Sequence, residues 1–123
     1  MINGVHDIYY NVSDMNKAVR FYRDYLNMKI IFESDHWTSL DSAGVMIGLH
    51  WNGGSEVPLS PRDAHGAHCG ATLTLSSTDV SSDRKVLEKA GATILGEADE
   101  QWGHMLIFED PDGNVLKLQK AKY

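Results

Sequence analysis

The chain has 123 residues, of which 42% are hydrophobic and 23% charged, so it can fold as one globular domain around one core. A formal net charge of −6 without any Lys/Arg cluster argues against nucleic acid and anionic membrane surfaces as partners. No apolar run is long enough for a signal peptide or a membrane span, and the single cysteine, Cys69, cannot form an intrachain disulfide. We therefore expect a cytoplasmic protein whose partner is a small molecule.

The first half of the chain predicts one strand, one helix and three further strands. Residues 5–12 alternate between apolar and polar side chains, as a half-buried strand does. Asp14 is placed to cap a helix that ends near Leu26, and Asn27 can adopt the left-handed conformation at its end. The three strands that follow are expected at residues 29–33, 37–41 and 45–51.

The second half repeats this order after a connection, residues 53–70, that is rich in Gly, Ser, Pro and His. A strand is expected at 71–76, followed by a helix that begins at Asp79 or Ser81 and ends at Gly91. The last three strands are expected at residues 92–95, 105–109 and 115–119, with a tight turn at 110–113 between the last two.

Two copies of a βαβββ unit are therefore predicted. Neither copy can bury its apolar face alone, so the pattern is typical of one structural unit used in tandem. We expect a single domain, residues 1–123, made of module one (about 4–52) and module two (about 71–120).

Two segments resemble a known family. Residues 10–26, YNVSDMNKAVRFYRDYL, resemble the opening module of the vicinal oxygen chelate superfamily, and Trp102-Gly103 followed by DPDGN at 110–114 resembles its closing module. The family includes glyoxalase I, extradiol dioxygenases, fosfomycin-resistance transferases, methylmalonyl-CoA epimerase and the bleomycin-resistance binding proteins. The resemblance implies an α+β fold in which the two modules form a curved, cup-like mixed sheet with helices on the outer face. It also implies a homodimer.

The resemblance further implies four positions for the ligands of a divalent metal in the cup. On this sequence they fall on Asp7, His50, Thr72 and Lys117. Threonine is a poor ligand and a lysine ammonium adds positive charge where the metal would sit, so we expect no metal. The alternative is a divalent metal held by His50, Asp7 and one further residue.

His50 and Asp7 are also candidates for catalysis without a metal. Strand alternation places His50 on the same face as Met46, away from the core. Family geometry, in which the first and fourth strands of a module are neighbours, implies that Asp7 lies beside His50. A carboxylate that orients an imidazole is typical of a general base, but the same pair can be purely structural. Lys117 could receive an anionic ligand group or neutralise Asp7.

Aromatic and histidine side chains supply the remaining candidates. Large aromatics can stack on a flat ligand, but they also fill cores and interfaces. His104 faces either the cup or solvent, and the group His65, His68 and Cys69 lacks the second ligand pair of a closed zinc site. The expected ligand-binding residues are Tyr9, Trp37, Met46, Thr72, Trp102, His104 and Lys117.

The sequence thus favours a protein of the bleomycin-resistance type that binds a small molecule in the cup without a metal. The reason is that the chemistry of this family depends on a metal, and the ligand positions implied by the resemblance do not suit one. The alternative is a glyoxalase-related lyase, isomerase or dioxygenase that uses His50, with Asp7, as a base or as part of a divalent metal site.

Overall fold

The computed structural model describes residues 1–123 and divides them into two compact units, Met1–Val57 and Pro58–Tyr123. Each unit has its own four-stranded mixed sheet with one helix on one face. The α+β class and the two βαβββ repeats are therefore confirmed, with two separate open sheets in place of one. The boundary between the units lies within the connection that the sequence predicts.

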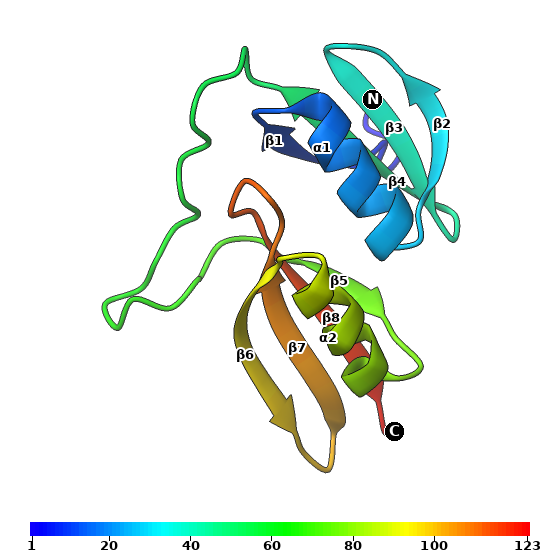
Figure 1. The fold of residues 1–123 in the computed structure, drawn as a ribbon. Coiled ribbons are helices and arrows are strands. Elements are labelled where there is room, and N and C mark those ends of the chain that lie inside the picture. The colour runs from blue at the N-terminus through cyan, green and yellow to red at the C-terminus, as the bar shows by residue number, and fades with distance from the viewer. The chain divides into compact units, whose positions relative to one another are not determined.

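The first unit contains β1 (Ile8–Val12), α1 (Met15–Arg20), η1 (Phe21–Tyr25), β2 (Lys29–Glu33), β3 (Trp37–Ser42) and β4 (Val45–Trp51). Its strands lie in the order β1-β4-β3-β2. The first and fourth strands are parallel neighbours and the other pairs are antiparallel. Helix α1 packs against β3 and β4 (Figure 1).

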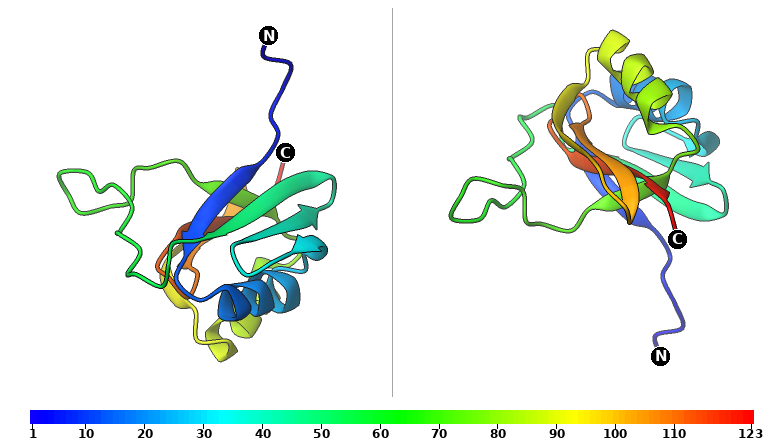
Figure 2. Two further views of the ribbon diagram at one scale, coloured as in Figure 1. Left: turned by 90° about the horizontal axis from the view of Figure 1, so that it is seen from above. Right: turned by 90° about the horizontal axis from the view of Figure 1, so that it is seen from below.

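Two elements of this unit differ from the prediction. The strand expected from residue 5 begins only at Ile8, and the exposed residues 1–6 extend away from β1 (Figure 2). The helix expected to reach Leu26 changes after Arg20 into the π-helical segment η1. In this wider turn two consecutive large aromatics, Phe21 and Tyr22, are both buried in the core.

The core of the first unit lies between α1 and one face of its sheet. Leu40, Ile47 and Leu49 are fully buried on the sheet, and Val19 and Tyr22 are buried on the helical side. Because side chains alternate along a strand, the residues between these core positions lie on the other face. We call the face of each sheet opposite its helix the open face of that unit.

The second unit contains β5 (Leu73–Ser76), α2 (Val80–Lys89), β6 (Thr93–Asp99), β7 (Gly103–Glu109) and β8 (Val115–Ala121). Its order, β5-β8-β7-β6, repeats that of the first unit, with β5 parallel to β8. Strands β6, β7 and β8 are longer than expected. The core joins Leu87 of α2 to Leu106, Phe108, Leu116 and Leu118 of the sheet.

The turn between β7 and β8 forms as the sequence predicts. Asp110 is buried, and its Oδ1 accepts hydrogen bonds from the backbone N–H groups of Asp112 at 2.8 Å and Asn114 at 2.9 Å. Gly113 has a φ of 83°, a left-handed conformation that favours glycine. This turn fixes the register of β8 against β7.

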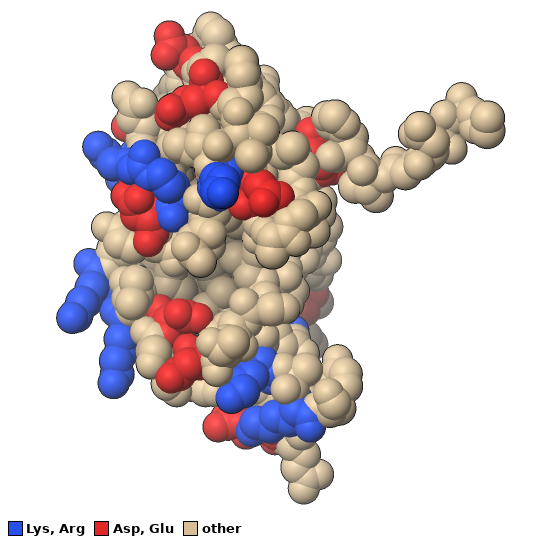
Figure 3. All heavy atoms as spheres, turned by 90° about the vertical axis from the view of Figure 1, so that its right-hand side faces the viewer, with Lys and Arg blue, Asp and Glu red and all other residues tan.

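The surface carries both signs of charge. On the face shown in Figure 3, Lys and Arg side chains are interspersed with Asp and Glu side chains. None of the helices combines the length and the apolar character that crossing a bilayer would require.

Candidate functional site

The helix caps provide a common reference for comparing the two units. The carboxylate of Asp14 accepts a hydrogen bond from the backbone N–H of Lys17, and that of Asp79 accepts one from Ser82, each at 3.1 Å. Asp7 and Thr72 each lie seven residues before their cap, so they occupy equivalent positions, as the resemblance implied.

The same comparison changes the position that the resemblance assigned to His50. Tyr9 and Thr74 each lie five residues before their cap, and they pair with Gly48 and Lys117 respectively. The residue of the first unit that is equivalent to Lys117 is therefore Gly48. His50 lies two residues further along β4.

The expected contact between Asp7 and His50 is wrong. In the parallel register His50 pairs with Asn11, and its Nδ1 lies 3.1 Å from Asn11 Oδ1. Asp7 precedes β1, and extending the register places it level with Met46, four residues before His50 on β4. Because each residue of a strand advances about 3.3 Å, the two side chains are separated by several residues' length.

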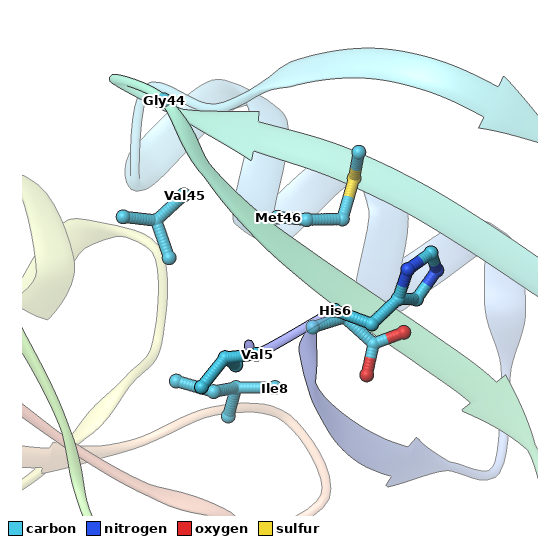
Figure 4. A pocket seen from close by; sticks show the side chains of 7 residues that line it. Val5, His6, Ile8, Gly44, Val45 and Met46 are labelled. Atoms are coloured by element: carbon cyan, nitrogen blue, oxygen red, sulfur yellow. The ribbon is translucent and has the colours of Figure 1, made fainter. Parts of the chain in front are cut away.

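Asp7 instead lines a pocket of about 260 Å³ where β4 begins, together with Val5, His6, Ile8, Gly44, Val45 and Met46 (Figure 4). Val45 and Met46 point to opposite sides of the strand (Figure 4). Met46 is half-buried, whereas Val5 and His6 belong to the exposed segment before β1.

Three rings gather on the open face of the first unit. The ring centroids of Tyr9 and Trp37 lie 5.4 Å apart, those of Tyr9 and His50 6.1 Å and those of Trp37 and His50 6.3 Å. The indole N–H of Trp37 donates a hydrogen bond to Ser39 Oγ at 2.8 Å. The structure thus brings together three residues that the sequence singled out.

Trp37 also covers the position on β4 that is equivalent to Lys117. A Cβ built on Gly48 would lie 2.4 Å from two ring atoms of Trp37 and 2.9 Å from Tyr9 Cβ. The indole therefore fills the space that a longer side chain at Gly48 would need.

The open face of the second unit carries Lys117 and Thr74 beside the apolar side chain of Ile107, which pairs with Lys117. Lys117 is half-buried beside Thr74, and its Nζ lies 6.0 Å from the centroid of the Trp102 ring. None of the five ion pairs of the structure includes Lys117. The hydroxyl of Thr72 lies 2.7 Å from Nε2 of His68.

His104 lies on the face that α2 covers, so its expected place in the cup is wrong. Its Nε2 lies 2.9 Å from Glu97 Oε2, and the other oxygen of Glu97 accepts a hydrogen bond from Arg84 of α2 at 2.7 Å. The Arg84 hydrogen bond, assisted by His104, holds the pKa of Glu97 below its ordinary value. The His104 side chain belongs to an ion-pair network between helix and sheet.

The donor set at the four family positions does not fit a divalent metal. The second unit offers a neutral hydroxyl at Thr72 and an ammonium at Lys117, and the first offers Gly48 beneath an indole, which leaves Asp7 as the one strong ligand. His50 is displaced from this set and is hydrogen-bonded to Asn11.

The sequence reasoning missed Asn11 and underrated His68. Asn11 shares a face with Tyr9 because it lies two residues further along the same strand, so the period of two was a usable signal. In the sequence, His68 is a candidate only for a zinc site. Its contact with Thr72 depends on the fold of the connecting segment, which shows no periodicity.

Residues 4–118 match the family model for the Glyoxalase/Bleomycin resistance protein/Dioxygenase superfamily. The chain belongs to this superfamily. It is 29% identical to the metallothiol transferase FosB of Staphylococcus haemolyticus, over 96% of this chain and 84% of that protein. It is 28% identical to FosB of Staphylococcus saprophyticus, over 96% of this chain and 77% of that one. The crystal structure of the fosfomycin resistance protein FosX from Listeria monocytogenes, complexed with Mn(II) and sulfate, superimposes with a TM-score of 0.76 at 20% identity, covering 98% of this chain and 92% of that one.

Proposed function

We propose that this protein binds a small organic anion without a divalent metal. The observation that carries the proposal is Lys117, a half-buried ammonium without a carboxylate partner, at a position where the family's enzymes hold a metal ligand. A partly buried charge is stabilised by an opposite charge, and a bound anion supplies one. Thr74 pairs with Lys117 on the neighbouring strand, and its hydroxyl adds a hydrogen-bonding group for the same anion.

The relatives indicate the type of anion. FosX of Listeria monocytogenes has been crystallised with Mn(II) and sulfate, and a mutant of it with Mn(II) and 1S,2S-dihydroxypropylphosphonic acid. In those complexes a metal accompanies a tetrahedral anion. In this chain the fixed charge of Lys117 would take over the charge of the missing metal, so phosphonates and phosphates are the first ligands to test.

The rings of Tyr9, Trp37 and His50 supply a surface on which a flat ligand group can stack.

We also propose a homodimer. Light scattering of the purified protein tests this, with a mass near 27 kDa expected for a dimer of the 13.7-kDa chain.

A second candidate function is proton transfer with His50 as general base. Asn11 Oδ1 accepts from Nδ1 of His50, which leaves the lone pair of Nε2 for a substrate proton. A glyoxalase-like lyase or isomerase that needs no metal is the enzyme class that this arrangement favours. Loss of turnover in His50→Gln with unchanged ligand binding would support it.

The test of the anion proposal is a thermal melting screen on metal-free protein. Phosphonates, phosphates and carboxylates are expected to raise the melting temperature, whereas Mn(II), Zn(II) and Ni(II) are not. Lys117→Met should weaken binding of the best ligand by about 10- to 100-fold, because a hydrogen bond to a charged group is lost. Lys120→Met, an exposed lysine that pairs with His104, is the matched control and should bind normally.

Two results would overturn the proposal. One is a clear rise in melting temperature with a divalent metal in the wild-type protein. The other is equal ligand affinity in Lys117→Met and wild type.

A further inference from the structure

Ser60, His68 and Thr72 form a continuous chain of hydrogen bonds in the second unit. Ser60 Oγ lies 2.7 Å from His68 Nδ1, and His68 Nε2 lies 2.7 Å from Thr72 Oγ1. Thr72 Oγ1 in turn donates to the carbonyl oxygen of Gly70 at 3.2 Å. Both nitrogens of one imidazole are therefore engaged by hydroxyl groups.

The last of these bonds sets the direction of the others. A threonine hydroxyl has one hydrogen, and that of Thr72 is given to Gly70, so Thr72 accepts from Nε2–H of His68. In a neutral imidazole the other nitrogen then carries a lone pair, so Nδ1 accepts the hydrogen of the Ser60 hydroxyl. The hydroxyl proton of Ser60 thus already points at the lone pair of His68 Nδ1.

The local fold holds the imidazole in place. Residues 61–69 form a small hairpin, in which Cys69 N–H donates to Pro61 O at 3.0 Å and Asp63 N–H donates to Ala67 O at 2.9 Å. A Cβ built on Gly70 would lie 3.3 Å from His68 Cε1 and 3.1 Å from Pro61 Cδ, so the ring, the proline and the glycine backbone are closely packed. Ser60 and His68 are both half-buried and remain partly open to solvent.

We propose that Ser60 is a nucleophile for acyl transfer from small activated carboxylic esters, with His68 as its general base and Thr72 as a positioning residue. A nucleophile within hydrogen-bond reach of a base that a third group orients is the arrangement that activates a serine.

Acyl transfer to Ser60 and release of the acyl group need no reagent other than the ester and water. Ser60 Oγ bonds to the ester carbonyl carbon while its proton passes to His68 Nδ1, and that proton leaves with the departing alkoxide as an alcohol. Water then attacks the acyl-serine, gives one proton to Nδ1, and releases the carboxylic acid as the Ser60 hydroxyl is restored. Neither a metal nor Lys117 takes part, so this site and the anion site can fail independently.

The experiment uses the full chain with Cys69→Ser as background. Cys69 is exposed, and its thiol would react with the labelling probe and with the ester substrate. A fluorophosphonate probe, from which the serine oxygen displaces fluoride, is followed by intact-mass and peptide mapping. Turnover of p-nitrophenyl acetate is measured in parallel. Labelling is expected at Ser60 and should disappear in Ser60→Ala, whereas Ser55→Ala, a serine of the same connection, should label normally.

His68→Asn should slow labelling by about 100-fold or more, the effect expected for loss of a general base. His65→Asn is the matched control, because the imidazole of His65 makes no hydrogen bond. Thr72→Val should slow labelling, and Thr72→Ser should restore it, which a merely structural role would not require. The absence of labelling in wild type, label elsewhere than Ser60, or an unchanged rate in His68→Asn would each overturn the proposal.

Discussion

Alanine at Gly48 is expected to destabilise the first unit by about 1–2 kcal/mol. The new Cβ would lie 2.4 Å from Cη2 and Cζ2 of Trp37, whereas carbon atoms in contact are about 3.5–4.0 Å apart. Inserting a methyl group into such a space costs about 1–3 kcal/mol. Relief requires the indole to move, which breaks its hydrogen bond to Ser39, about 1 kcal/mol, and its edge contact with Tyr9, about 1 kcal/mol. Alanine loses less backbone entropy on folding than glycine does, which offsets about 0.5–1 kcal/mol of this destabilisation.

Urea unfolding, followed by circular dichroism and by tryptophan fluorescence, measures this cost. Gly96→Ala is the matched control, because a Cβ at that strand glycine meets nothing within 4 Å, and its stability should be unchanged or slightly raised. In a Trp37→Ala background the alanine at Gly48 should cost much less, since the clashing ring is gone. Equal cost in both backgrounds, or no cost in the wild type, would refute the conclusion that Trp37 covers Gly48.

Three further predictions concern the second unit. The double variant Thr72→His and Lys117→Glu supplies two metal ligands where the wild type has none, and it should bind Zn(II) or Mn(II) more tightly by calorimetry; equal metal binding would show that these positions do not form a site. The lowered pKa of Glu97 means that its contribution to stability is present above the ordinary glutamate pKa of about 4.3 and is lost as the pH falls through the still lower folded value. Melting curves from pH 7 to 3 should therefore show Glu97→Gln less stable at neutral pH and converging on the wild type in acid. Asp79→Ala removes the cap of α2 and should lower the melting temperature by a few degrees, whereas Asp79→Asn should retain most of it because asparagine also caps helices.

Most of the fold could be predicted because its signals are local. The caps Asp14 and Asp79, the left-handed residue Asn27 with a φ of 58° and the glycine turn at Gly113 act within a few residues of themselves. The π-helical segment η1 could not be predicted, because its cause is the burial of Phe21 and Tyr22 in a core assembled from distant strands. Tertiary packing there overrides the regular helical period.

The site was harder to predict because it depends on register. Alternation places His50 on the open face, but which residue it meets depends on how β1 aligns with β4, and a shift along the strand exchanges Asp7 for Asn11. The position of His104 illustrates a second limit. His104 lies on the face of β7 that α2 covers, where its Nε2 meets Glu97, and Glu97 also accepts a hydrogen bond from Arg84 of α2. This contact depends on how β6, β7 and α2 pack together.

The two units carry different chemistry at equivalent positions, and this difference bears on how a ligand would be bound. At the position where the second unit has Lys117 the first has Gly48, and the space above the glycine is taken by an indole. An ammonium attracts anions through a charge that salt screens, whereas aromatic stacking depends on apolar contact that salt does not weaken. Ligand affinity in Trp37→Ala should therefore keep the salt dependence of the wild type, and affinity in Lys117→Met should lose it. If both variants kept the same salt dependence, the anion would be held by some group other than Lys117, and the proposed replacement of a metal by this lysine would be wrong.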